Sequence, residues 1–391
     1  MRRFGLAMIL LCVLLLVASP ALATESTAVP EMLAEQLAAL DTAGVEAFLA
    51  ELNRTGADYL PPLTLQSVVG FFRGQGEIPG IREIINGSCQ YLFREVLGSA
   101  HLLGKILILA VVAAVLGKLQ EAFGGENTAR LALVVIYLVL VALALTSFSV
   151  AVATASAVVD SLVTFMVALL PLLIPLVAAT GAVVTAGLFS PLMIFATQAT
   201  GMVVKEFVLP LIFCGAILEL VSRVWEGVSV SSLAALLRQA GLTLLGFFFS
   251  VFLGVMAVQG AAGAIADGVT VRTAKFLSGT FIPVVGGMFA DAVEVVIGSA
   301  LILKNAVGLL GVLAIFLTIL FPLLKLLAVV LVYRVGAALV QPLGAAAVGD
   351  CLQVIANTLT LFLVATAAVG LMFLITVTVI IGAGNVAVML R

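Results

Sequence analysis

The feature that most constrains this chain is a series of apolar stretches of about 18 or more residues each, which fill most of the sequence after His101. Such stretches are long enough to cross a bilayer as helices, and they lack the alternation that barrel strands need. With 63% hydrophobic and 10% charged residues, the chain cannot cover a water-facing surface. We therefore expect an all-α, polytopic membrane protein with about 7–9 membrane segments, some of them broken or re-entrant.

The N-terminus has the three parts of a secretory signal peptide. Arg2 and Arg3 give a charged start, an apolar run follows over residues 4–17, and Ala21-Leu22-Ala23 offers a small-x-small cleavage site. The sequence therefore predicts a signal peptide over residues 1–23, with an uncleaved anchor as the alternative. In both cases residue 24 begins outside the cytoplasm.

Residues 24–98 differ from the rest, with ten acidic and four basic residues. In DTAGVEAFLAELNRTG, apolar residues recur at i, i+3, i+4 and i+7, which predicts a helix capped by Asp41 or Thr42 and ended by Gly56. A second amphipathic run covers residues 81–96. We expect three or four short helices that form an extracytoplasmic helical region.

Residues 99–391 are predicted to form the transmembrane helical domain. Segments are expected at about 102–120, 129–152, 158–180, 240–260, 281–303, 306–334 and 356–382, with two more within 181–222. The loops that carry Lys118 and Arg130, and Arg223 and Arg238, are predicted to be cytoplasmic. The same count places the basic residues near 272 outside, so either one segment is re-entrant or the count is wrong by one.

Proline spacing suggests an internal repeat. Pro171 and Pro210 are separated by the same interval as Pro283 and Pro322, which aligns residues 160–222 with 272–334. Repeats with discontinuous helices are typical of secondary transporters. Coincidence in a low-complexity apolar chain is the alternative.

A charged block stands out within this apolar sequence: DGVTVRTAKFLSGTFIPVVGGMFADAVE, from Asp267 to Glu294. In a helix that begins after Pro283, one face carries Gly287, Asp291, Glu294, Gly298 and Asn305. A carboxylate at mid-bilayer costs about 2.5–3.5 kcal/mol, so this face should meet protein, a water-filled cavity or a region outside the hydrocarbon. A solvated amphipathic segment at the membrane surface is the alternative.

The cost of polar groups in an apolar context defines a candidate polar functional patch. Its members are Arg272, Lys275, Asp291, Glu294, Lys304 and Asn305. Small residues let helices approach closely, and the candidate packing glycines are Gly260, Gly268, Gly287 and Gly298. Packing inside the chain and an oligomer seam both remain open for them.

Several classes of function are disfavoured by the residue types. The four cysteines form no CxxC pair and His101 is the only histidine, so a metal site, a cofactor site or a Cys/His catalytic site is not expected. No protease motif is present, and the chain is predicted not to be an enzyme. The net charge is -2 without a basic cluster, so nucleic acid is not an expected partner.

The block from Gly268 to Gly308 resembles the signature region of the stage III sporulation protein AE family of endospore-forming bacteria. Shorter segments add to the resemblance: YLFREVL, FVLPLIFCGAILELVS, ALVQPLG and IIGAGN. The resemblance implies a multi-pass subunit, in the mother-cell membrane around the forespore, of a secretion-like channel complex that links the two cells. It implies a role in forespore maintenance and late forespore gene expression, and no catalytic residues.

The partners implied by the resemblance are other stage III sporulation A-type membrane proteins and their ATPase, besides the lipid bilayer and a possible homo-oligomer. A stand-alone secondary transporter, built on the proline-spaced repeat, is the alternative function. A scaffold that only holds other subunits is a third.

Overall fold

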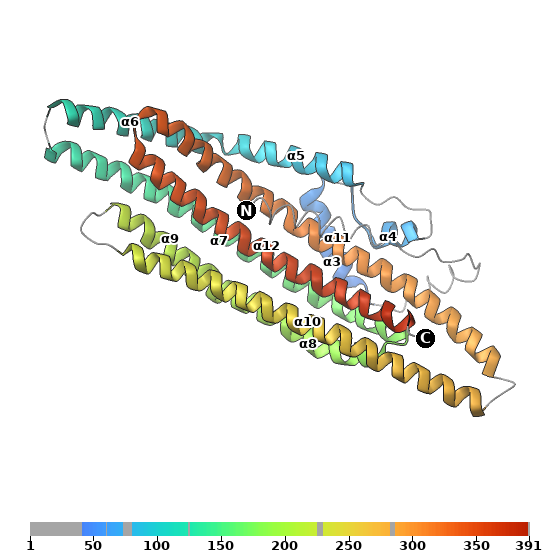
Figure 1. The fold of residues 1–391 in the computed structure, drawn as a ribbon. Helices are drawn as coiled ribbons and strands as arrows, with labels where there is room; N and C mark the ends of the chain where they lie inside the picture. Colours follow the sequence, from blue (N-terminus) through green and yellow to red (C-terminus); the bar gives the residue numbers. More distant parts are fainter. Residues whose placement is uncertain are drawn as a thin grey trace.

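The computed structural model describes residues 41–59, 61–72, 80–123, 126–224, 230–281 and 286–389. Throughout these residues the chain forms helices joined by short turns, and the helices lie side by side in an elongated bundle (Figure 1). The all-α expectation is therefore confirmed. The predicted signal peptide lies outside the described residues.

The N-terminal region contributes three described helices: α3 (Ala43–Gly56), α4 (Leu65–Phe72) and α5 (Ile81–Gly98). The predicted spacing is correct for α3, because Val45, Leu49 and Leu52 are buried. Its start is held by Asp41, whose carboxylate accepts a hydrogen bond from the Ala43 amide at 3.2 Å. The helices α3 and α4 bury apolar residues against the long helices of the bundle, whereas Ile85, Phe93 and Leu97 of α5 remain exposed.

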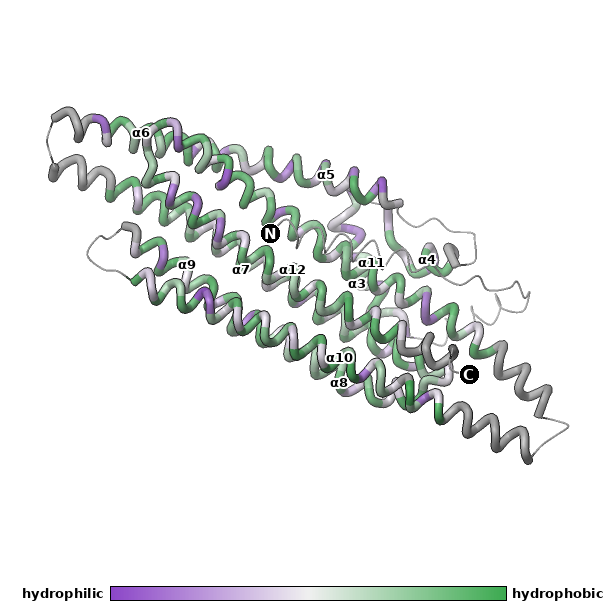
Figure 2. The backbone as a smooth tube through the Cα atoms, viewed as in Figure 1, coloured by the Kyte–Doolittle hydropathy of each residue, from purple (hydrophilic) through white to green (hydrophobic). Residues whose placement is uncertain are grey.

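The remaining helices carry the apolar sequence. They are α6 (Ala100–Phe123), α7 (Glu126–Ala179), α8 (Val183–Met202), η1 (Val203–Val208), α9 (Leu209–Val224), α10 (Ser231–Phe281), α11 (Gly286–Val340), η2 (Gln341–Leu343) and α12 (Ala346–Met389). Among the described residues, six helical segments are long and apolar enough to cross a membrane. Figure 2 shows the contrast between the long, mostly hydrophobic helices and the more polar α5.

The expected boundaries inside two of these helices are wrong. The predicted pairs 129–152 and 158–180, and 281–303 and 306–334, merge into the single helices α7 and α11. Pro171, Pro175 and Pro322 lie inside these helices without ending them. In a packed apolar bundle, neighbouring helices and side-chain hydroxyls compensate the backbone groups that proline leaves unpaired. The two segments expected within 181–222 likewise form one continuous helical segment, Val183–Ser222, and these three fusions explain why six long helical segments replace about 7–9 shorter ones.

Proline has a visible effect before Pro210. The six residues of η1 form a π-helical turn directly ahead of Leu209 and Pro210. Proline donates no N–H, and its ring clashes with the carbonyl four residues earlier, so the chain widens there instead of continuing as a regular helix. The π turn places Lys205 and Glu206 in the middle of a long apolar segment.

The bundle is much longer than a bilayer is thick. The apolar segment of α6 has 19 residues, whereas those of the other five helical segments have 37 to 48. At 1.5 Å per residue, α6 spans about 29 Å and the others about 55–72 Å. A hydrocarbon core is about 30 Å thick, and helix tilts reach only about 40°, so the longer helices extend beyond it.

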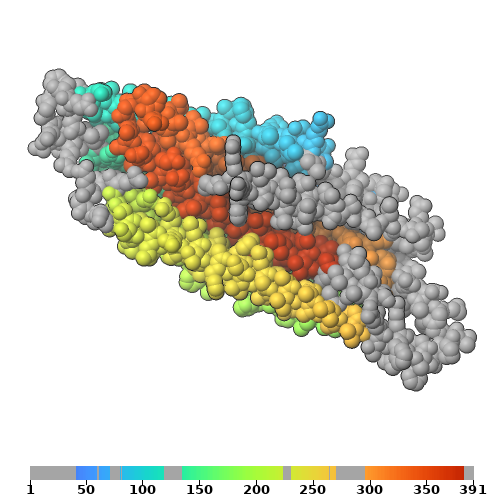
Figure 3. Space-filling model, in the orientation of Figure 1, coloured from blue at the N-terminus to red at the C-terminus, as the bar shows by residue number. Residues whose placement is uncertain are grey.

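The packing is closest between α11 and α12. An added Cβ at Gly308 would lie 2.3 Å from the Ile381 side chain, and one at Gly370 would lie 2.3 Å from that of Ile319. The helices α5 and α6 follow one another along α11, while α8, α9 and α10 form the opposite side of the bundle (Figure 1). The outer face of α10 is open to the surroundings over most of its length (Figure 3).

The two halves of the proposed repeat differ at one point that the structure describes. Residues 180–182 form the turn between α7 and α8, in which Gly181 has a φ of 89°. The residues aligned with this turn in the second half lie inside α11. The repeat stays a prediction, because the loop that contains Pro283 lies outside the described residues.

Candidate functional site

The predicted polar patch is distributed over two helices. Arg272 and Lys275 lie on α10, and Asp291 and Glu294 lie on α11. The side chains of these four residues lie outside the described part of the structure. Their helices meet at one end of the bundle, far from the α6–α7 loop (Figure 1).

Lys304 and Asn305 of the patch are placed between α11 and α12. The Lys304 side chain is fully buried, and its Nζ donates a hydrogen bond to the Ile381 carbonyl at 3.0 Å. The Oδ1 of Asn305 is buried and accepts no hydrogen bond from the described residues. A buried lysine amino group that donates to a backbone carbonyl ties the end of α12 to α11, which the sequence alone did not indicate.

The candidate packing glycines fall into two groups. An added Cβ at Gly260 would lie 3.1 Å from Val379 of α12, and Gly268 is buried, so both face the bundle. A Cβ at Gly298 would meet no atom within 4 Å. The surroundings of Gly287 lie outside the described side chains.

Asp267 connects α10 to the start of α8. Its carboxylate is fully buried and accepts hydrogen bonds from the Val184 amide at 2.8 Å, from the Thr185 amide at 3.2 Å and from the Thr185 hydroxyl. These amides are among the first N–H groups of α8, which have no acceptor within their own helix. Asp267 therefore caps α8 from a different helix, and the helix dipole favours its negative charge.

Two ion pairs join helices that are distant in sequence. Lys205 Nζ contacts Asp160 Oδ1 at 2.6 Å, with side-chain exposures of 30% and 58%, and Arg238 Nη1 contacts Glu219 Oε2 at 2.7 Å. The sequence analysis missed both pairs. The available signal was the presence of an acid and a base, each isolated in apolar sequence, because such groups need partners.

A cleft lies where the N-terminal helices meet the long helices, and we call it the junction cleft. It has a volume of about 310 Å³ and is lined by residues of α3, α5, α7 and α11: Phe48, Glu51, Leu52, Thr55, Tyr91, Thr154, Ala157, Val158, Ser161, Leu317, Thr318, Phe321, Pro322 and Lys325. Tyr91 packs against Phe321 with ring centroids 5.1 Å apart. Burial raises the pKa of the Tyr91 phenol, so this hydroxyl stays protonated at neutral pH.

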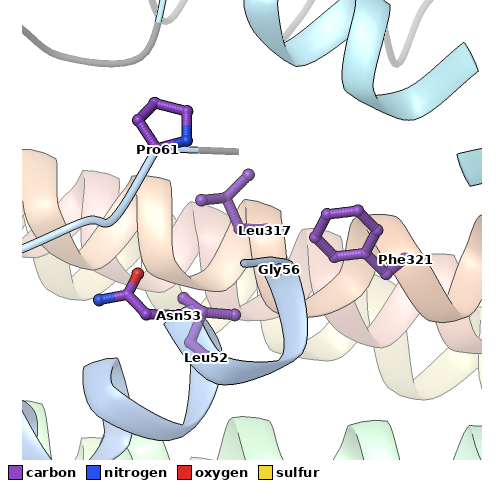
Figure 4. A pocket seen from close by; sticks show the side chains of 6 residues that line it. All are labelled: Leu52, Asn53, Gly56, Pro61, Leu317 and Phe321. Atoms are coloured by element: carbon purple, nitrogen blue, oxygen red, sulfur yellow. The ribbon is translucent and has the colours of Figure 1, made fainter. Parts of the chain in front are cut away.

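Beside the junction cleft, the end of α3 lines a second, smaller pocket. Figure 4 shows Leu52, Asn53 and Gly56 of α3 and the following Pro61 over Leu317 and Phe321 of α11. Asn53 fixes the turn by donating to the Leu63 carbonyl and accepting from the Leu63 amide, both at 2.8 Å. These bonds fix Leu63 beside α3, and the N-terminal region contacts α11 through α3, α4 and α5.

Polar side chains also form a stripe on the outside of α11 and α12, and we call it the polar stripe. It consists of Arg334, Asp350, Gln353, Asn357 and Thr360. The last four recur at helical spacing on α12, and the first four are exposed. The Arg334 guanidinium donates a hydrogen bond to the Thr360 hydroxyl at 3.4 Å. The Gln353 side-chain amide donates to the side-chain Oδ1 of Asn357, also at 3.4 Å.

The polar stripe adjoins the turn between α11 and α12. Residues 341–344, with the sequence QPLG, are all exposed, and Gly344 has a φ of 80°. Gly336, close to this turn, packs against Ile106 of α6, and η2 contacts α6 directly. The turn therefore lies beside the middle of the apolar segment of α6, Ala100–Lys118.

Among the described residues, no cluster of His, Cys, Asp and Glu could hold a metal ion.

The fold and these polar groups define the class: a multi-pass, all-helical membrane protein with a helical N-terminal region packed on its long helices. The model of the family described as stage III sporulation protein AE matches residues 63–384, and the chain belongs to this family. It is similar to the stage III sporulation protein AE of Bacillus subtilis (strain 168), with 39% identity over 362 residues that cover 92% of this chain and 90% of the relative. No solved structure matches the chain. Membership makes it a sporulation protein.

Proposed function

We propose that this sporulation membrane protein is a subunit of a secretion-like channel complex that links the mother cell and the forespore. Its site would be the mother-cell membrane around the forespore, with the N-terminal region outside the cytoplasm. Its partners would be other stage III sporulation A-type membrane proteins and their ATPase. The proposal assigns the chain no catalytic activity and no cofactor, and its role would be forespore maintenance and late forespore gene expression.

The observation that carries this proposal is the excess length of the apolar helices. Only α6 matches a single bilayer, and the charged helix α5 precedes it along α11. The hydrocarbon is therefore placed at the level of α6, and the half of the bundle beside α3, α4 and α5 lies beyond it. With the hydrocarbon at this level, the adjoining charged ends of α10 and α11 lie far from the bilayer.

The half of the bundle beyond the hydrocarbon exposes large apolar side chains. On α10, Val258 is 68% exposed and Ile265 is 65% exposed, and Val269 continues the same face. Val183 and Leu188 of α8 are exposed as well. An apolar surface of this extent outside lipid needs protein to cover it, which favours a subunit of an assembly over a protein that acts alone.

The experiment is recovery of partners from sporulating cells. The tagged chain is solubilised from membranes, and co-purified proteins are identified for the wild type, for Val258→Lys and for the control Arg54→Glu, whose side chain is 81% exposed on α3. We expect the wild type and the control to recover the sporulation partners. Val258→Lys should lose them at least tenfold while its amount in the membrane stays unchanged.

A solitary protein would behave differently. Recovery of the wild type without partners, together with solute uptake when it is reconstituted alone in vesicles, would establish the secondary transporter instead. Loss of Val258→Lys from the membrane would mean that this face lies in lipid.

A further inference from the structure

We propose that the α11–α12 turn and the polar stripe line a water-filled passage that enters the membrane beside α6. The inference deepens the proposed channel function and rests on its placement of the hydrocarbon. The lining is one face, formed by residues 341–344 and the polar stripe. The cargo would be water and small hydrophilic solutes.

The first argument is the depth of the turn relative to α6. The contact between Gly336 and Ile106 fixes the level of α11, and α6 continues in apolar sequence to Lys118. Val111, Val112 and Val115 of this continuation are exposed, so lipid must reach at least as far as they do. Residues 341–344 follow Gly336 by five to eight residues, or about 7–12 Å, whereas Lys118 follows Ile106 by twelve residues, or about 18 Å, so the turn lies about 6–10 Å inside the end of the apolar segment of α6.

A second observation is the exposed backbone at the turn, where the structure shows only the bond from the Gly344 amide to the Gln341 carbonyl among the described residues. The last carbonyl groups of α11 and the first N–H groups of α12 have no partners within their helices. The four residues of the turn are exposed instead of being covered by other helices. Non-helical backbone at membrane depth is stable only where protein buries it or water reaches it, and residues 341–344 stay exposed although η2 contacts α6.

The third argument is the chemistry of the adjoining side chains. Gln353 and Asn357 bond to each other at 3.4 Å, which leaves most of the donors and acceptors of two exposed amides unused. The exposed guanidinium of Arg334 has only the Thr360 hydroxyl at 3.4 Å. Exposure of these polar groups to lipid would cost free energy. In contact with water, the amides, the hydroxyl and the guanidinium can form hydrogen bonds to small polar solutes.

The lining is tested by thiol labelling with a small, membrane-impermeant methanethiosulfonate. The four cysteines Cys12, Cys89, Cys214 and Cys351 are first replaced. Single cysteines are then introduced as Gln353→Cys and Asn357→Cys. The control is Val111→Cys, which is 47% exposed in the apolar segment of α6. Rates are measured for the full chain in phospholipid nanodiscs and for the assembly in sporulating cells.

We expect both stripe cysteines to react at least tenfold faster than the control cysteine in both settings. Equal, slow rates in nanodiscs would place the stripe against lipid and overturn the inference. Fast labelling in nanodiscs with protection in the assembly would also overturn it, because a partner would then cover the stripe. If labelling contradicts the passage, the wild-type chain should still recover its partners in the co-purification experiment. If the proposed function is wrong, the wild-type chain should recover no partners.

Discussion

Removal of the Asp267 carboxylate is expected to destabilise the turn between α7 and α8 more than any exposed acid would. The carboxylate is buried and serves the Val184 amide, the Thr185 amide and the Thr185 hydroxyl. In Asp267→Leu, the two amides lose their acceptor while they remain inside the bundle. Each buried donor left without a partner costs about 1–3 kcal/mol, so the two amides predict a loss of about 2–6 kcal/mol.

A series of smaller substitutions separates the loss of the capping hydrogen bonds from the change in side-chain size. Asp267→Asn keeps one acceptor oxygen and should cost about 1–2 kcal/mol, near the usual value of a lost cap. Thr185→Val removes only the hydroxyl and should cost about 1 kcal/mol. The matched control is Asp58→Leu, since Asp58 is 73% exposed and its contact with Arg94 is 3.5 Å long. An exposed pair of this kind contributes at most about 1 kcal/mol.

The assay is equilibrium unfolding of the purified chain in mixed micelles, with the free energy of unfolding compared across the four variants. The order Asp267→Leu, Asp267→Asn, Thr185→Val, Asp58→Leu, from the largest loss to the smallest, is the expected result. If Asp267→Leu costs no more than the control, the carboxylate does not cap α8 and the argument is refuted.

Three further predictions concern packing, pairing and the charged hairpin. Gly308→Ala should cost about 1–3 kcal/mol in the same unfolding assay, because the new methyl group overlaps an isoleucine of α12; an unchanged free energy would show that the contact relaxes freely. Asp160→Lys and Lys205→Asp should each lower thermal stability and sporulation, and the double exchange should restore both, because opposite charges again face each other at the 2.6 Å contact; a double variant worse than either single one would deny the pairing. Asp291→Lys should abolish sporulation while Asp41→Lys supports it, and equal tolerance in a spore count would mean that the hairpin charges are only solvated.

Local periodicity was sufficient for the N-terminal region. The residues that α3 buries are the ones that recur at helical spacing, and Asp41 caps its start as expected. Bulk apolarity was likewise sufficient for the all-α membrane class, because lipid leaves few alternatives for an uninterrupted apolar chain. Both inferences use information that lies within a short window of sequence.

Long-range features could not be read in this way. The partners of Asp160 and Asp267 are 45 and 82 or more residues away, so only the fold brings them together. The boundaries expected at 152–158 within α7 and at 303–306 within α11 were wrong, because packed neighbours such as Ile381, whose carbonyl accepts a hydrogen bond from Lys304, let the helix continue past polar residues. Emphasis on charges also left out Gln353 and Asn357, whose helical spacing on an apolar segment was the available signal.

The central claim, that half of the bundle lies beyond the hydrocarbon, is tested most directly by comparing two single cysteines in a cysteine-free chain in nanodiscs. Val111→Cys lies on the exposed face of α6, and Ile265→Cys lies on the exposed face of α10, on the side of the bundle opposite α5. With a membrane-impermeant maleimide, we expect rapid labelling at position 265 and almost none at position 111. Protection of both positions by lipid would contradict the claim.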